Sequence, residues 1–80
     1  MENKKLVYMI DKDKILMKAV EKYSLLKDFA HDIGITYGRF NCICKTKYES
    51  KIRILQQLHK INRVLHFENI NDLIIVVEEE

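Results

Sequence analysis

The sequence contains no proline and only two glycines in 80 residues. Because proline interrupts helices and glycine destabilises their interior, this scarcity allows helices to run without a break. Internal repeats and low-complexity linkers are also missing, so nothing divides the chain, and a chain of this length holds a single core. We therefore predict one domain over residues 1–80.

Long hydrophobic runs are missing as well, since none approaches the roughly 18 residues that a membrane-spanning helix needs. The first apolar run, residues 6–10, is too short for the core of a signal peptide, and no small-residue cleavage site follows it. Apolar residues make up 48% of the chain and charged residues 32%. These features predict a cytoplasmic protein that has no membrane partner.

Cysteine occurs only at Cys42 and Cys44, and the histidines His31, His59 and His66 are scattered. A disulfide between residues two positions apart is strained, and a zinc site needs four ligands with a recognisable spacing. We therefore expect ordinary thiols, surface histidines, no metal site and no cofactor. The chain also lacks paired carboxylates with a base, a nucleophile with a partner and a phosphate-binding loop, which predicts that it is not an enzyme.

Charge of one sign is nearly absent from two parts of the chain. Residues 39–63 carry seven lysines or arginines and one acid, Glu49, whereas residues 64–80 carry five acids and no base. Basic segments often contact nucleic acid, but a solvated basic face explains this charge equally well. We expect the acidic end, residues 78–80, to be a solvated tail.

Short apolar runs near the two ends, residues 6–10 and 73–77, are rich in β-branched side chains and predict strands. Each run is apolar on both faces, so an isolated strand would be costly in water. We expect the two strands to pair, within one chain or between two. The second run could equally extend the last helix.

Apolar residues between these runs recur at steps of three and four, which predicts helices at about 13–23, 25–33, 36–44 and 51–65 and a short turn at 70–73. The expected N-caps are Asp11 or Asp13, Ser24, Thr36 and Asn69, and Gly34 should end the second helix. The side chains expected to face inward are Ile15, Leu16, Ala19, Val20, Tyr23, Leu25, Leu26, Phe29, Ala30, Ile33, Phe40, Ile43, Ile52, Leu55, Leu58, Ile61, Val64 and Leu65.

The segment from Leu26 to Lys45 satisfies the spacing of a particular twenty-residue unit. Its fifth residue is small, Ala30, where two helices cross closely, and its ninth is Gly34, which suits a left-handed turn. Positions four, eight, ten, fifteen and eighteen are all apolar: Phe29, Ile33, Ile35, Phe40 and Ile43. In this pattern the segment resembles the helix-turn-helix of the phage Cro/repressor family. The resemblance extends over about residues 13–73.

This resemblance implies a mainly α, four-to-five-helix, lambda-repressor-like helix-turn-helix domain, with its motif at about 25–45. The terminal runs would add a short two-stranded sheet. In the family, the second helix of the motif lies in the major groove of DNA. By position, the base-reading residues are Thr36, Tyr37, Gly38, Asn41 and Cys42. The implied phosphate-binding residues are Lys27, Arg39, Lys45, Lys47, Tyr48 and Lys51, of which Arg39 could serve bases instead.

The function implied is a repressor-like, sequence-specific DNA-binding transcriptional regulator of phage or mobile-element type. It would act as a homodimer on a two-fold operator in double-stranded DNA. An alternative is a protein-interaction module, such as an antirepressor or an inhibitor of a host complex, that keeps the fold without binding DNA. Two features favour this alternative: Gly38 offers no side chain to read a base, and the C-terminus is acidic.

Overall fold

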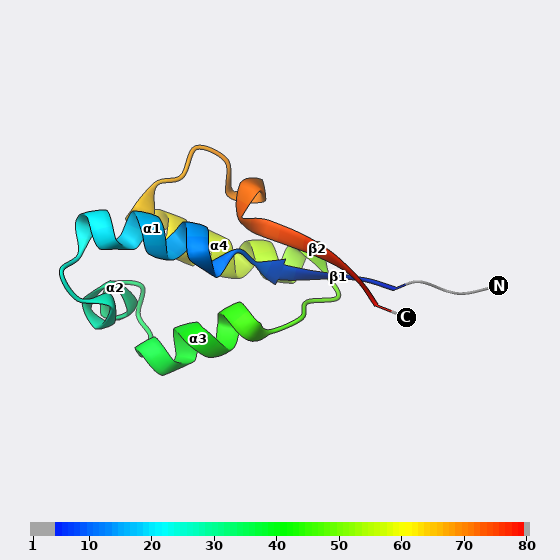
Figure 1. Cartoon of the computed structure of the whole chain (residues 1–80), viewed down its shortest axis with the longest axis horizontal. Coiled ribbons are helices and arrows are strands. Elements are labelled where there is room, and N and C mark those ends of the chain that lie inside the picture. Colours follow the sequence, from blue (N-terminus) through cyan, green and yellow to red (C-terminus); the bar gives the residue numbers. More distant parts are fainter. Residues whose placement is uncertain (1–4, 80) are drawn as a thin grey trace.

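Four helices separate, along the sequence, two strands that come from opposite ends of the chain and lie side by side in the fold (Figure 1). The computed structural model describes residues 5–79. Its elements are β1 (Lys5–Ile10), α1 (Lys12–Lys22), α2 (Leu26–Asp32), α3 (Tyr37–Lys45), α4 (Lys51–Leu65), the 3₁₀ turn η1 (Ile70–Leu73) and β2 (Ile74–Glu79). The predicted fold class, mainly helical with a small sheet from the termini, is confirmed.

The sheet is a single antiparallel pair in which Lys5 lies opposite Glu79 and Ile10 lies opposite Ile74. The predicted pairing is therefore confirmed, and the alternative in which the second run extends a helix is wrong. On its other edge, β1 exchanges two backbone hydrogen bonds of 2.8 Å between Tyr8 and Tyr48. The loop that joins α3 to α4 is thereby fastened to the sheet.

The predicted acidic tail is part of β2 rather than a solvated end. Glu79 is half-buried, and its Oε2 lies 3.1 Å from the Nζ of Lys47. Glu80 lies outside the described residues. The prediction failed because the strand continues two residues beyond the apolar run, and the ladder with β1 carries the acids toward the basic loop.

Three of the predicted N-caps are confirmed. The side chains of Asp11, Thr36 and Asn69 each accept a hydrogen bond from a backbone N–H two or three residues further along, at 3.0–3.3 Å. Ser24 does not cap α2, because the residue that precedes this helix is Leu25, in extended backbone and without a side-chain cap. The start of α2 therefore has no side-chain acceptor for its first N–H groups.

The core lies where all four helices meet the sheet and η1, and its largest fully buried side chains are Phe29, Phe40, Ile15, Ile54, Leu58, Leu73 and Val7. Three residues expected to face inward are instead exposed: Val20 at 60%, Leu25 at 52% and Ile52 at 69%. Successive helical residues differ by about 100°. Val20 is one position past buried Ala19, and Ile52 is two positions before buried Ile54, so both point away from the core. Within residues 5–79, no helix has the length and apolar character needed to cross a membrane.

Candidate nucleic-acid interface

Helices α2 and α3 are joined by the turn at residues 33–36, in which Gly34 has a φ of +88°. This is the left-handed backbone predicted for Gly34, and glycine adopts it without strain. The turn is held by the backbone N–H of Ile35, which donates to the carbonyl of Ala30 at 3.0 Å. The rings of Phe29 and Phe40 meet edge to face, with centroids 5.3 Å apart. The apolar pattern therefore places both helices against one core.

A second contact holds α2 against the end of α1. The hydroxyl of Tyr23 donates to Oδ2 of Asp32 at 2.6 Å. This hydrogen bond, with some help from burial, raises the pKa of Tyr23 to about 12. At neutral pH the hydroxyl therefore keeps its proton and stays a donor, so the orientation of α2 has a polar anchor as well as an apolar one.

The five predicted base-reading residues divide into two groups. Thr36, Gly38 and Cys42 are exposed, whereas Tyr37 and Asn41 are half-buried. The ring of Tyr37 stacks on that of Phe40 at 6.0 Å and packs against the core. Base reading implies that Tyr37 faces away from the core, yet its ring lies on the core side of α3, because residues three apart on a helix share a side.

Asn41 contributes no side-chain hydrogen bond to the described fold. Its Oδ1 is buried and accepts none from any residue between 5 and 79. A buried acceptor without a partner costs about 1–3 kcal/mol. The amide is therefore better explained by a role outside the fold than by stability, although it must rotate outward to meet a ligand.

Gly38 is exposed on α3, and the space beside its Cα is open. A Cβ built there would meet only the Oγ1 of Thr36, at 4.0 Å, so nothing in the described fold requires glycine at this position. Glycine in a helix interior costs about 1 kcal/mol relative to alanine. A close approach of the helix backbone to a ligand would account for this cost.

The six predicted phosphate-binding residues also fall into two groups. Lys27, Arg39, Lys45 and Lys51 are exposed, and none of them forms an ion pair with a described residue. Lys47 is occupied by Glu79. Tyr48 is half-buried, and its hydroxyl donates to the carbonyl of Ile43 at 3.4 Å.

A recess of about 310 Å³ lies between α3 and the first half of α4. We call it the arginine recess, and it is lined by Arg39, Ile43, Thr46, Tyr48, Arg53, Gln56 and Gln57. Burial raises the pKa of Tyr48, and a hydrogen bond with the side chain of Thr46 opposes this rise more than the nearby positive charge of Arg39 does. An adjoining hollow of about 410 Å³ shares Thr46, Tyr48 and Arg53 and extends to Lys47. Arg39, Arg53 and Lys47 thus lie along one surface.

Arg53, Gln56 and Gln57 were not among the predicted site residues. The charge count placed Arg53 in the basic segment but gave no sign of a partner, because the sequence does not tell which side of α4 faces α3. One signal was present: Arg53, Gln56 and Gln57 lie three and four positions apart, so they share one side of a helix.

The acid of the basic segment, Glu49, lines the adjoining hollow together with Arg53 but pairs with a different cation. Glu49 is hydrogen-bonded and ion-paired with Lys5 of β1. This contact raises the pKa of Lys5 and lowers that of Glu49. Neither Arg39 nor Arg53 has a described carboxylate as an ion-pair partner, so the recess keeps a positive charge.

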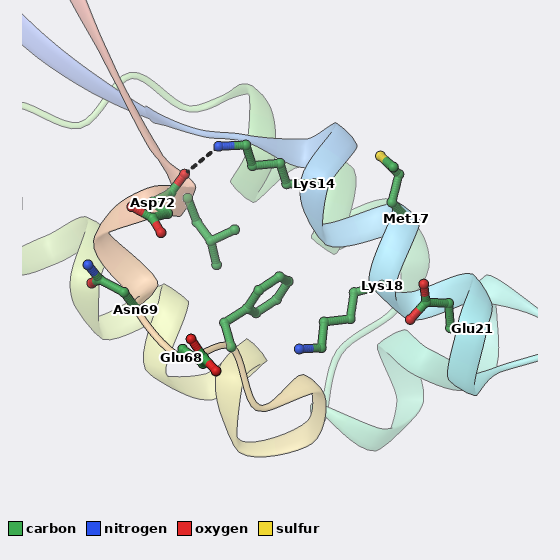
Figure 2. A pocket seen from close by; sticks show the side chains of 9 residues that line it. Lys14, Met17, Lys18, Glu21, Glu68, Asn69 and Asp72 are labelled. Atoms are coloured by element: carbon green, nitrogen blue, oxygen red, sulfur yellow. Dashed lines mark hydrogen bonds between the residues drawn. The ribbon is translucent and has the colours of Figure 1, made fainter.

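A third hollow, of about 460 Å³, lies between α1 and the segment at residues 67–73 (Figure 2). Three lysines one turn apart on α1 donate to backbone carbonyls in this part of the fold: Lys14 to Asp72 at 3.2 Å, Lys18 to His66 at 3.2 Å and Lys22 to Val64 at 2.7 Å. We call these three residues the lysine ladder. The last carbonyls of a helix have no partner within it, so Lys18 and Lys22 complete the end of α4, whereas Lys14 holds η1.

The same hollow is a poor site for an anion. Lys14 and Lys18 are engaged by carbonyls, and Lys18 also lies 4.7 Å above the ring of Phe67. Three acids, Glu21, Glu68 and Asp72, line the same space. Figure 2 shows Glu21, Glu68 and Asp72 around the same hollow as Lys14 and Lys18. The contacts close the segment after α4 onto α1.

The two cysteines are free, and they occupy different environments. Cys42 is exposed, whereas Cys44 is buried and only 4% accessible. Burial raises the pKa of Cys44 to about 11. Among the described residues, no group of three His, Cys, Asp or Glu side chains is placed to hold a metal ion.

Comparisons of the chain with protein-family models, with curated proteins and with solved structures found no match. A function is therefore inferred from this geometry and from the motif between Leu26 and Lys45.

Proposed function

We propose that this protein is a repressor-like, sequence-specific DNA-binding transcriptional regulator. The observation that carries the proposal is the surface formed by α3, the loop after it and the start of α4. Arg39, Lys45, Lys51 and Arg53 lie there without a described ion-pair partner, next to the exposed residues Thr36 and Gly38. Cations without a partner can contact the phosphates of a duplex, and the exposed start of a helix can lie against its bases.

In the proposed complex, α3 lies in the major groove and the loop with α4 lies along the backbone. The Oγ1 of Thr36 accepts a hydrogen bond of 3.1 Å from the backbone N–H of Arg39. This cap fixes the first turn of α3, which would meet base edges. Asn41 would read an adenine edge once its amide turns outward. Lys47 would exchange Glu79 for a phosphate.

The proposed regulator acts as a homodimer on a two-fold operator, because one such domain contacts too few base pairs for useful specificity. Two apolar side chains on one face of the sheet supply a surface for the second copy: Leu6 is 48% exposed and Val76 56%. A domain this small would repress by occupying a promoter. We propose a cytoplasmic regulator of phage or mobile-element type.

Two observations favour a second candidate, a protein-interaction module such as an antirepressor. Tyr37 and Asn41 are half-buried, and Lys47 is paired, so the reading surface is poorer than the motif implies. Met17 and Val20 leave apolar surface on α1, at 71% and 60% exposure. The two candidates differ in whether random duplex DNA binds.

The test is fluorescence anisotropy of a labelled random-sequence duplex, titrated with the protein between about 50 and 200 mM KCl. We expect the logarithm of the binding constant to fall linearly with that of the salt concentration, with a slope of about −0.9 for each phosphate contacted. Lys14→Gln is the matched control, because it removes a charge outside the proposed surface. A folded protein that binds no duplex at the lowest salt concentration would rule out the regulator and leave the interaction module as the remaining candidate.

A further inference from the structure

The arginine recess combines charge, donors and size in a way that no other described hollow does. Two guanidinium groups, from Arg39 on α3 and Arg53 on α4, line it together with the side-chain amides of Gln56 and Gln57. Within residues 5–79, neither guanidinium group forms a hydrogen bond or an ion pair. The recess therefore holds donors that the fold leaves unused.

Arginine suits one class of ligand above others. The planar guanidinium group presents paired N–H donors that match two oxygens of a phosphate. A phosphate monoester carries about two negative charges at neutral pH and offers three acceptor oxygens. Two arginines and two amides from opposite walls of the recess supply both the charge and the additional donors.

The walls of the recess are fixed in place, so its shape does not depend on a ligand. Thr46 donates its hydroxyl to the carbonyl of Cys42 at 2.8 Å, and Tyr48 is tied to the sheet through Tyr8. Buried Ile54, next to Arg53, anchors the first turn of α4 in the core. Only the long side chains of the arginines and glutamines must order when an anion enters.

We propose that the arginine recess binds one phosphate group through Arg39 and Arg53. The phosphate belongs either to the backbone of a DNA duplex or to a free nucleotide that acts as an effector. The first source rests on the proposed function, in which case Arg53 is a phosphate clamp that positions α3 in the groove. The second source does not depend on it.

The decisive variant is Arg53→Gln, because Arg53 is exposed and its replacement leaves the core intact. Arg63→Gln is the matched control, since it removes the same group from an exposed position of α4 that lines another hollow. Circular dichroism should give both variants the melting temperature of the parent protein. Each is then titrated with a random-sequence duplex at several salt concentrations and, separately, with adenosine 5′-monophosphate by NMR.

If the phosphate is that of DNA, Arg53→Gln weakens duplex binding about tenfold and lowers the salt slope by about one, while Arg63→Gln has a smaller effect on both. If the phosphate is that of a nucleotide, adenosine 5′-monophosphate shifts the side-chain amide signals of Gln56 and Gln57, and Arg53→Gln removes these shifts. Either result supports the proposal that the arginine recess binds a phosphate group.

Equal effects of the two variants on duplex binding, together with no shift at Gln56 or Gln57, would overturn the proposal. Failure of the proposed function looks different, because the parent protein then binds no duplex at any salt concentration. In that case the nucleotide titration still decides whether the recess holds a phosphate.

Discussion

The lysine ladder on α1 and the arginine recess between α3 and α4 use the same charge for different purposes. In the ladder, Lys14, Lys18 and Lys22 each donate to a backbone carbonyl. In the recess, Arg39 and Arg53 have no described hydrogen-bond acceptor for their guanidinium groups. Cations of the first kind stabilise the fold, and those of the second kind are available to a ligand. The presence of a partner, and not the charge, separates them.

This comparison also corrects what the distribution of charge in the sequence suggests. The ladder lies in residues 1–38, where acids and bases nearly balance, and the recess lies in the basic segment, where Glu49 is the one acid. Glu49 pairs with Lys5 and Glu79 pairs with Lys47. Two acids thus neutralise the edge of the basic surface next to the sheet, and the arginines further along α3 and α4 keep their charge.

The largest expected effect comes from removing the ring that supports α3. Phe40 is fully buried against Phe29, so Phe40→Ala should lower the free energy of unfolding by about 3–5 kcal/mol. Phe40 takes part in none of the ladder contacts, so the substitution removes none of them directly. Urea denaturation measures the loss. Cys42→Ala, at an exposed position of α3, is the control and should stay within about 0.5 kcal/mol of the parent; equal values for the two variants would contradict this packing.

A smaller loss of stability is expected at Tyr37, whose side chain packs against the core and is also a proposed base-reading residue. Tyr37→Ala removes a half-buried ring stacked on Phe40, and we expect a loss of about 1–2 kcal/mol in the free energy of unfolding. Tyr37→Phe keeps the ring and should be nearly neutral for stability. If the hydroxyl reads a base, both variants weaken binding to an operator selected from a random pool by about 1–3 kcal/mol. An operator affinity that Tyr37→Phe leaves unchanged would restrict Tyr37 to packing.

Periodicity predicted most of the fold because it reports on the core. The helix at residues 51–65 was predicted at the bounds that α4 has, and Thr36 and Gly34 mark the ends they were expected to mark. The errors lie where the apolar face predicted for a helix is wider than the part of that face that the core buries. Val20 and Ile52 are apolar neighbours of inward residues, yet the core is too narrow to cover them.

The candidate site was less predictable, because it depends on which surfaces become neighbours. The motif indicated that Gly38 and Cys42 of α3 face outward, but it misplaced Tyr37. It also could not tell that Glu79 would reach Lys47 through the sheet. Nor could it tell that Arg53 would lie across from Arg39. Both facts follow from contacts between residues that are far apart in the sequence.

The smallest expected effect tests the ladder itself. Lys22→Met keeps most of the apolar stem and removes the ammonium group that donates to the carbonyl of Val64 at 2.7 Å. Because this cation lies at the C-terminal end of α4 and is exposed, we expect a loss of only about 0.5 kcal/mol in the free energy of unfolding. Lys60→Met, an exposed lysine of α4 for which no ion pair or hydrogen bond is described, removes the same charge and should cost less.

Thermal unfolding of the two methionine variants, measured side by side at low and high salt, gives the difference. The slope of duplex binding against salt adds a second measurement: Lys22→Met should leave it unchanged, whereas Arg53→Gln should lower it by about one. If Lys22→Met lowers the slope as much as Arg53→Gln does and leaves stability untouched, the ladder contacts DNA and the division between the two kinds of cation does not hold. If it lowers stability alone, Lys22 serves the fold through the carbonyl of Val64, and the proposed binding surface stays confined to α3, its loop and the start of α4.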